Sequence, residues 1–230
     1  MRYHMGIRPN IKALGVFAKY LEGVRALKAE PYSSSTSSAT NYYDVYVETH
    51  FANIPEVHGK PMFLPWHRLF LMDFELRIQT VLNDDTFALP YWDWAGDAAN
   101  PAGPNSIWVE NMMGEGANPI ENGPFANSTL WPTVPYSDRR VSFGNTLERD
   151  LIIRQGMASY PTNAGLDLLF NNTSYDAFRL AIEDGPHGFM HVWVGGQMAV
   201  VECSPNDPAF FLHHSNIDRL WASFDNLCYD

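Results

Sequence analysis

The chain has 230 residues, of which 46% are apolar and 14% aromatic, and its formal net charge is −11. This length and composition fit one folded domain with a sizeable core and exclude a disordered chain. The acidic balance argues against nucleic-acid binding, and no apolar stretch is long enough to cross a membrane. The first residues contain no recognisable export signal, which predicts a cytoplasmic protein or one exported together with a partner.

Hydrophobic periodicity predicts a mainly α-helical fold with long irregular loops and few short strands. A long loop region is expected between positions 95 and 135, where 17 of 41 residues are Gly, Pro or Asn. Asp207, followed by a first-turn proline, is the expected start of the last helix. Further helices are expected over residues 10–28, 41–50, 65–82, 146–155 and 174–183, and the strand candidates are residues 192–194 and 199–201.

Most of the eight histidines fall into two groups. His187 and His191 are four residues apart, a spacing that places both imidazoles on one face of a helical turn. His67 lies on the apolar stripe of a predicted helix, as does one member of the His213–His214 pair, and periodicity alone does not choose between these two. A single buried histidine is more often a hydrogen-bonded core residue than a ligand. Two groups on apolar faces instead indicate a pair of metal sites, because unpaired buried polar groups cost about 1–3 kcal/mol each.

The ligand type narrows the choice of metal. Imidazole suits copper, zinc, iron or nickel, and it excludes the oxygen-seeking ions Mg²⁺ and Ca²⁺. The Glu-x-x-His pattern of di-iron bundles is absent from the sequence, and a hydrolytic zinc pair would normally have a bridging carboxylate. Two sites built from neutral nitrogen donors therefore favour copper over a zinc or iron hydrolase.

Three segments carry a resemblance to a known family: FLPWHRLFL (63–71), PYWDW (90–94) and NDPAFFLHHSNIDRLW (206–221). Together they resemble the tyrosinase and polyphenol oxidase family of type 3 dicopper proteins. The resemblance implies a single catalytic domain over residues 1–230, with an antiparallel four-helix core that holds a dicopper centre. It also suggests a short, bacterial-like form without a C-terminal lid domain.

The resemblance implies a role for each site residue. Copper-dependent oxidation of o-diphenols to o-quinones is the expected activity, with O₂ as co-substrate and ortho-hydroxylation of monophenols as a second activity. Glu183 is the expected catalytic residue, because it stands where many relatives have a glutamate that helps to deprotonate phenol through a bound water. Copper A would be held by His50, His58 and His67, and copper B by His187, His191 and His214, with His213 as a structural neighbour.

Four further residues are expected to surround the substrate or the ligands. Phe210 would pack against the copper B ligands, and Asp218 would either orient an imidazole or pair with Arg219 or solvent. Gly188 and Val192 directly follow two ligands, on the substrate side. Gly188 stands where tyrosinases with strong monophenol activity often carry Asn, so we expect diphenol oxidation to be faster than monophenol hydroxylation.

Some questions stay open at the level of sequence. Fungal, molluscan and plant relatives link the second copper A histidine to a cysteine, but no cysteine lies near His58, and Glu56 stands at the fungal cysteine position. This departure favours the bacterial-like branch. A haemocyanin-like reversible O₂-binding protein and an o-aminophenol oxidase are the alternative functions. A copper-delivery partner is conceivable, pairing of Cys203 with Cys228 is undecided, and the oligomeric state is not predicted.

Overall fold

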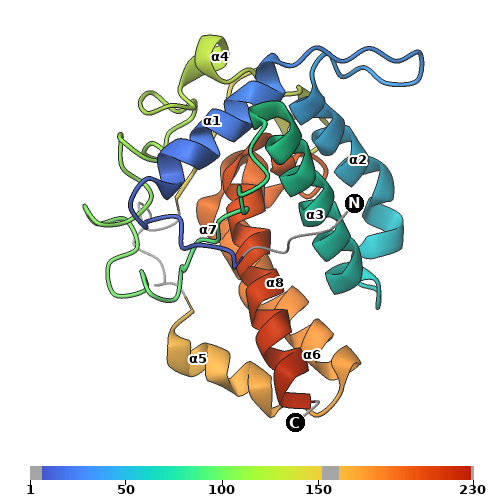
Figure 1. Cartoon of the computed structure of the whole chain (residues 1–230), viewed down its shortest axis with the longest axis vertical. Coiled ribbons are helices and arrows are strands. Elements are labelled where there is room, and N and C mark those ends of the chain that lie inside the picture. Colours follow the sequence, from blue (N-terminus) through green and yellow to red (C-terminus); the bar gives the residue numbers. More distant parts are fainter. Residues whose placement is uncertain (1–6, 152–160, 229–230) are drawn as a thin grey trace.

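The computed structural model describes residues 7–151 and 161–228. The described residues are mostly helical, which confirms the mainly α prediction (Figure 1). None of the helices within these ranges is long and apolar enough to span a membrane. The longer helices are α1 (Val16–Ala29), α2 (Tyr42–Val57), α3 (Phe63–Leu82), α6 (Tyr175–Ile182), α7 (Gly188–Val194) and α8 (Ala209–Cys228), and the short ones are α4 (Asn127–Leu130) and α5 (Asn163–Asp167).

The helical core is built around α8, which runs through the middle of the molecule (Figure 1). α3 packs against both α8 and α1, and α2 packs against α1 and α3. Aromatic rings fill the contact: Phe74 of α3 stacks on Phe211 of α8, and Tyr43 and Tyr46 of α2 meet both rings edge-on. Burying each such ring contributes about 1.5–3 kcal/mol, so these contacts fix how α2, α3 and α8 lie.

The first two helices differ from the predicted ones at one end each, and α3 agrees with its prediction to within two residues. α1 begins at Val16 rather than at residue 10, because Gly15 before it has a left-handed backbone (φ 78°). The predicted start of α2 is confirmed, since the Asn41 side chain accepts a hydrogen bond from the amide of Asp44. However, the predicted end near His50 is wrong, because α2 continues to Val57 even though Pro55 lies in its last turn. Val57 is buried there.

A kink joins α6 to α7. Between these helices, residues Glu183–His187 form a wide turn in which Gly185 has non-helical angles (φ −88°, ψ −112°) next to Pro186. The Gly-Pro pair stops α6 near the predicted position and turns the chain so that α7 begins at Gly188.

Both strand predictions are wrong. Residues 192–194 form the last turn of α7, and residues 199–201 leave the short 3-10 turn Gly196–Ala199. Short β-branched runs carry no periodicity, so the adjacent helical turn decides their conformation. The only strands among the described residues are β1 (Tyr136–Ser137) and β2 (Ser142–Phe143), an antiparallel pair in which Tyr136 lies opposite Phe143.

The loop regions follow the prediction only in part. Residues 95–135 are turns and bends with α4 as their one helix, which confirms the expected long loop. The helix predicted over residues 146–155 is wrong for residues 146–151, and the rest lies outside the described residues. The reason is Arg149, which is fully buried and forms a two-pronged ion pair with Asp207 (2.6 and 2.7 Å) just before α8. The amides of this segment bond to distant backbone instead, for example Asp150 N–H to the carbonyl of Val194.

Candidate metal centre

The first group of histidines comes from α2 and α3. His50 lies on the buried face of α2, His58 is the residue that ends this helix, and His67 lies one turn into α3. One ring nitrogen of each lies within 4.8 Å of those of the other two. His50 and His67 are 1% and 3% exposed. The structure therefore brings together the three side chains predicted to form the copper A site.

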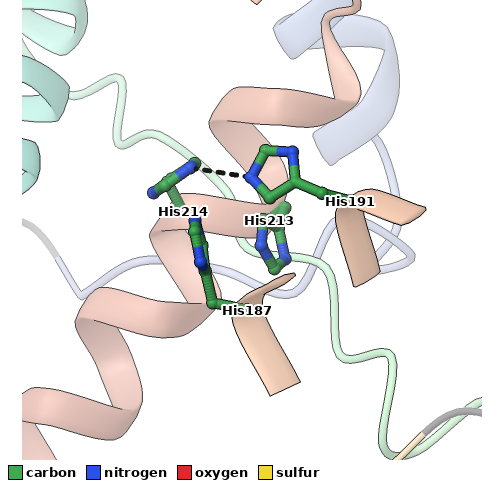
Figure 2. A group of neighbouring side chains, drawn as sticks. All are labelled: His187, His191, His213 and His214. Carbon is green, nitrogen blue, oxygen red and sulfur yellow. Dashed lines mark hydrogen bonds between the residues drawn. The ribbon is translucent and has the colours of Figure 1, made fainter. Parts of the chain in front are cut away.

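The second group lies between the α6–α7 kink and α8. His187 ends the kinked turn, His191 is one turn further along α7, and His213 and His214 come from α8 (Figure 2). Ring nitrogens of all four lie within 4.8 Å of one another, and Nε2 of His191 faces Nε2 of His214 at 3.3 Å. The structure thus gathers the predicted copper B residues, and His213 lies beside them as the neighbour that was expected there. His213 is fully buried, and its ring stacks with that of His187 at 5.5 Å.

The two groups adjoin. The rings of His67 and His214 stack in parallel with their centroids 4.3 Å apart and an interplanar angle of 6°. These residues belong to α3 and α8, whose packing through the aromatic core fixes the distance between the groups.

Backbone carbonyls select the nitrogen that three of the histidines present to the centre. The Nδ1 atoms of His67, His187 and His191 lie 2.8–3.0 Å from the carbonyl oxygens of Phe63, Glu183 and Met198, respectively. A carbonyl oxygen only accepts, so each Nδ1 bears the proton and each Nε2 carries the lone pair. Among the described residues, Nε2 of His67 and of His187 has no hydrogen-bond partner. Buried lone pairs without a donor fit a metal ion.

The imidazoles are neutral at physiological pH. Burial is the largest cause, and it lowers the pKa of His50, His67, His187, His213 and His214 well below the ordinary value. Burial also lowers the pKa of His58, and it lowers that of His191 to about 4. Metal binding needs neutral imidazole, and both groups consist of histidine alone. Such donor sets suit copper among the transition metals.

A cavity of about 390 Å³ opens beside the histidines. Gly188 and Val192, predicted to face the substrate, both line it, and Val192 is 55% exposed. Phe210 packs against the histidine rings. Its ring centroid lies 4.2 Å from that of His214 and 5.0 Å from that of His50, so it contacts a copper B residue as predicted. The other lining residues are His50, His58, Glu183, Asp184, His187, His191, Met198, Ala199, Val201 and Ser204.

Glu183 is buried in the cavity wall, and both of its carboxylate oxygens accept hydrogen bonds. Oε1 accepts from the amide of Gly59 (2.6 Å), and Oε2 accepts from Nη1 of Arg179 (3.0 Å). Burial raises the pKa of Glu183, and the bonds from Gly59 and Arg179 oppose this effect. Glu183 therefore ties the residue after His58 to the segment that leads to His187.

The predicted role of Asp218 as an imidazole partner is wrong. Its carboxylate accepts from Nε of Arg68 (2.5 Å) and pairs with Arg8 (3.1 Å). Arg219, the other predicted partner, lies over the ring of Tyr91. Although Asp218 is four residues after His214, its partners are two arginines from distant parts of the chain. The imidazoles with an identified Nδ1 partner use backbone carbonyls instead.

Cys203 is a buried free thiol, and the side chain of Cys228 lies outside the described residues.

Sequence reasoning missed Gly59, Arg179 and the carbonyl of Met198. Gly59 directly follows a ligand and has a left-handed backbone (φ 67°), a conformation that glycine adopts readily, so its position was a usable signal. Arg179 stands four residues before Glu183 on α6, which is a helical ion-pair spacing. The carbonyl acceptor carried no sequence signal, because any residue at position 198 supplies one.

Comparisons with known proteins agree with this geometry. The family model for the common central domain of tyrosinase matches residues 40–227. A tyrosinase from Streptomyces antibioticus is 37% identical over 211 residues, which cover 80% of this chain and 73% of that protein. A tyrosinase from Streptomyces glaucescens is 38% identical over 202 residues, covering 79% and 72% of the two chains.

A solved structure shares the fold. A polyphenol oxidase from Thermothelomyces thermophila, determined as a point mutant, superposes with a TM-score of 0.73 at 24% identity and covers 96% of this chain and 70% of that chain. The chain belongs to the tyrosinase family and is an oxidoreductase of the tyrosinase type.

Proposed function

We propose that the protein oxidises o-diphenols to o-quinones with O₂ at a dicopper centre, and that it hydroxylates monophenols more slowly. The paired histidine groups carry this proposal, because they set two all-imidazole donor sets side by side under one cavity. Copper A is assigned to His50, His58 and His67, and copper B to His187, His191 and His214. The bound coppers would supply the redox chemistry, in which two catechols each give up two electrons and two protons and one O₂ is reduced to two waters.

The protein's own groups prepare the site for this chemistry. The carbonyls that accept from Nδ1 hold three imidazoles in one tautomer and one orientation, so little reorganisation remains when the metal binds. Phe210 packs against His50 and His214 and keeps water from the buried side of the rings. Met198, Ala199 and Val201 give the cavity an apolar wall for an aromatic ring.

Glu183 is the residue we assign to proton transfer. It lies in the wall of the same cavity, and burial raises its pKa, which makes it a better proton acceptor than an exposed carboxylate. Each oxygen has one protein donor and a further lone pair that can accept from a water beside the substrate. We expect this to assist deprotonation of a monophenol, whose pKa is higher than that of a catechol.

The cavity favours an enzyme over a haemocyanin-like oxygen carrier. A carrier with a blocked pocket would exclude phenols, whereas this cavity reaches His50, His58, His187 and His191 and holds a volume in the range of small-ligand sites. Exposure of Val192 at its rim leaves a path for the substrate.

The test is a substrate panel on copper-reconstituted protein. Metal analysis is expected to find two copper ions per chain, and O₂ uptake should accompany quinone formation from 4-methylcatechol, with slower turnover of 4-methylphenol and of o-aminophenol. Glu183→Gln should slow the monophenol more than the catechol. Reversible O₂ binding without turnover would instead identify a carrier, and another metal dominant in active protein would refute the dicopper assignment.

A further inference from the structure

The cavity beside the histidines has an uneven charge. Its lining includes two carboxylates, Glu183 and Asp184, and no Lys or Arg among the described residues. Glu183 is buried and pairs with the guanidinium of Arg179 at 3.0 Å, a cation that it shares with Asp176. Asp184 is the exposed carboxylate of the lining, and it is therefore the one that a side chain entering from solvent would meet first.

Asp184 differs from Glu183 in its surroundings. Its side chain is exposed, and within the described part of the chain it forms no ion pair. It is nevertheless one of the residues that line the cavity, directly after Glu183 in the chain. Asp184 therefore contributes an unbalanced negative charge to the cavity.

The position of Asp184 in the cavity determines which part of a bound phenol lies near its charge. His187 and Glu183 are each 7% exposed and lie at the inner end, whereas Asp184 and Val192 are exposed at the rim. A phenol that brings its hydroxyl oxygens to the imidazoles points its para substituent the opposite way. The para substituent therefore reaches the rim, where Asp184 provides charge and Val192 an apolar contact.

We propose that Asp184 makes the cavity selective for phenols with a cationic amine on the para side chain, over phenols with a carboxylate there. This inference rests on the proposed phenol oxidation. At an exposed rim, one charge about 4 Å from another changes binding by about 5-fold. Binding of a phenol with a cationic amine is strengthened by this factor, and binding of one with a carboxylate is weakened by it. Binding of a phenol with a neutral side chain is unchanged.

Three catechols of similar shape test the inference: dopamine, 4-methylcatechol and 3,4-dihydroxyphenylpropionate, each compared by kcat/KM on the copper-loaded protein near pH 7. Asp184→Asn should lower the value for dopamine and raise that for the propionate, each about 5-fold and mainly through KM. The value for 4-methylcatechol should stay within about 2-fold. Added salt should reduce the wild-type preference, because it screens an exposed charge.

Asp85→Asn is the matched control, since Asp85 is an exposed carboxylate in the turn after α3 and does not line the cavity. It removes the same charge from the whole molecule and should leave all three values unchanged. Unaltered substrate ratios in Asp184→Asn, or the same change in both variants, would overturn the role of Asp184 while leaving phenol oxidation intact. If the wild type oxidises none of the three catechols, the proposed function itself fails.

Discussion

Three backbone carbonyls decide which nitrogen the imidazoles of His67, His187 and His191 present to a metal. The side chains themselves were predictable, because their spacing and their apolar neighbours are properties of the sequence. Their orientation was not, since the acceptors are main-chain atoms. Two of these acceptors, at Phe63 and Glu183, lie four residues before their histidine, and the third comes from the turn after α7. Metal selectivity is thus set by side chains, and tautomer by the backbone.

Gly188 sets the first prediction, at the scale of one residue. Its backbone is helical (φ −60°, ψ −38°), and an added Cβ would meet only the carbonyl oxygen of Glu183 at 3.4 Å. Asn therefore fits at this position and would place an amide beside Glu183, where it can help order a water. Gly188→Asn should raise the ratio of monophenol to diphenol turnover roughly 3- to 10-fold.

Gly188→Ala is the control, because it adds the Cβ without the amide. Its ratio should match that of the wild type in the same O₂-uptake assay. An unchanged ratio in Gly188→Asn, or an equal gain in both variants, would contradict the role assigned to this position.

At the scale of elements, sequence periodicity predicted the long helices well and the connecting segments poorly. α2, α3 and α8 have apolar stripes that continue over several turns, so their existence follows from local pattern. Residues 146–151 looked equally helical, but their conformation is set by the pairing of Arg149 with Asp207, which is 58 residues further along the chain. Local patterns carry no information about such a partner, and the same holds for Asp218 and its arginines.

The Arg149–Asp207 pair gives the second prediction. Both side chains are fully buried, and Asp207 also accepts from the amide of Ala209 at the start of α8. Arg149→Met leaves a buried carboxylate without its partner, which should cost about 3–5 kcal/mol of unfolding free energy. Urea denaturation measures this loss.

Arg140→Met is the comparison for that loss. Arg140 pairs with Asp138 and Glu202 at the surface and is 63% exposed, so its removal should cost less than about 1 kcal/mol. Similar small losses in both variants would show that the loop 146–151 is held by other contacts.

At the scale of the whole molecule, the fold keeps seven imidazoles uncharged in one region. Their pKa values are lowered by burial, so between about pH 6.5 and the lower folded values the unfolded chain binds more protons than the folded one. Stability of the copper-free protein should therefore fall as pH drops below about 6.5. For His191 the loss extends to about pH 4.

Thermal unfolding followed by circular dichroism from pH 7.5 to pH 4.5 checks this third prediction. Copper should raise the midpoint at pH 7, and its advantage should shrink as protons compete for the same nitrogens. A copper-free midpoint that stays flat between pH 7 and pH 5 would mean that the imidazoles titrate in the folded chain as they do in the unfolded one.

The hydrogen bond from Gly59 to Glu183 joins positions 124 residues apart. It links the segment that carries His58 to the segment that carries His187. When a metal ion fixes the position of one segment, the hydrogen bond therefore also restrains the other. Uptake of the two ions should accordingly be cooperative, with the singly loaded form scarce during titration. Glu183→Gln weakens that link, and equilibrium copper titration should then resolve two separate steps; two steps already in the wild type would show that the halves fill independently.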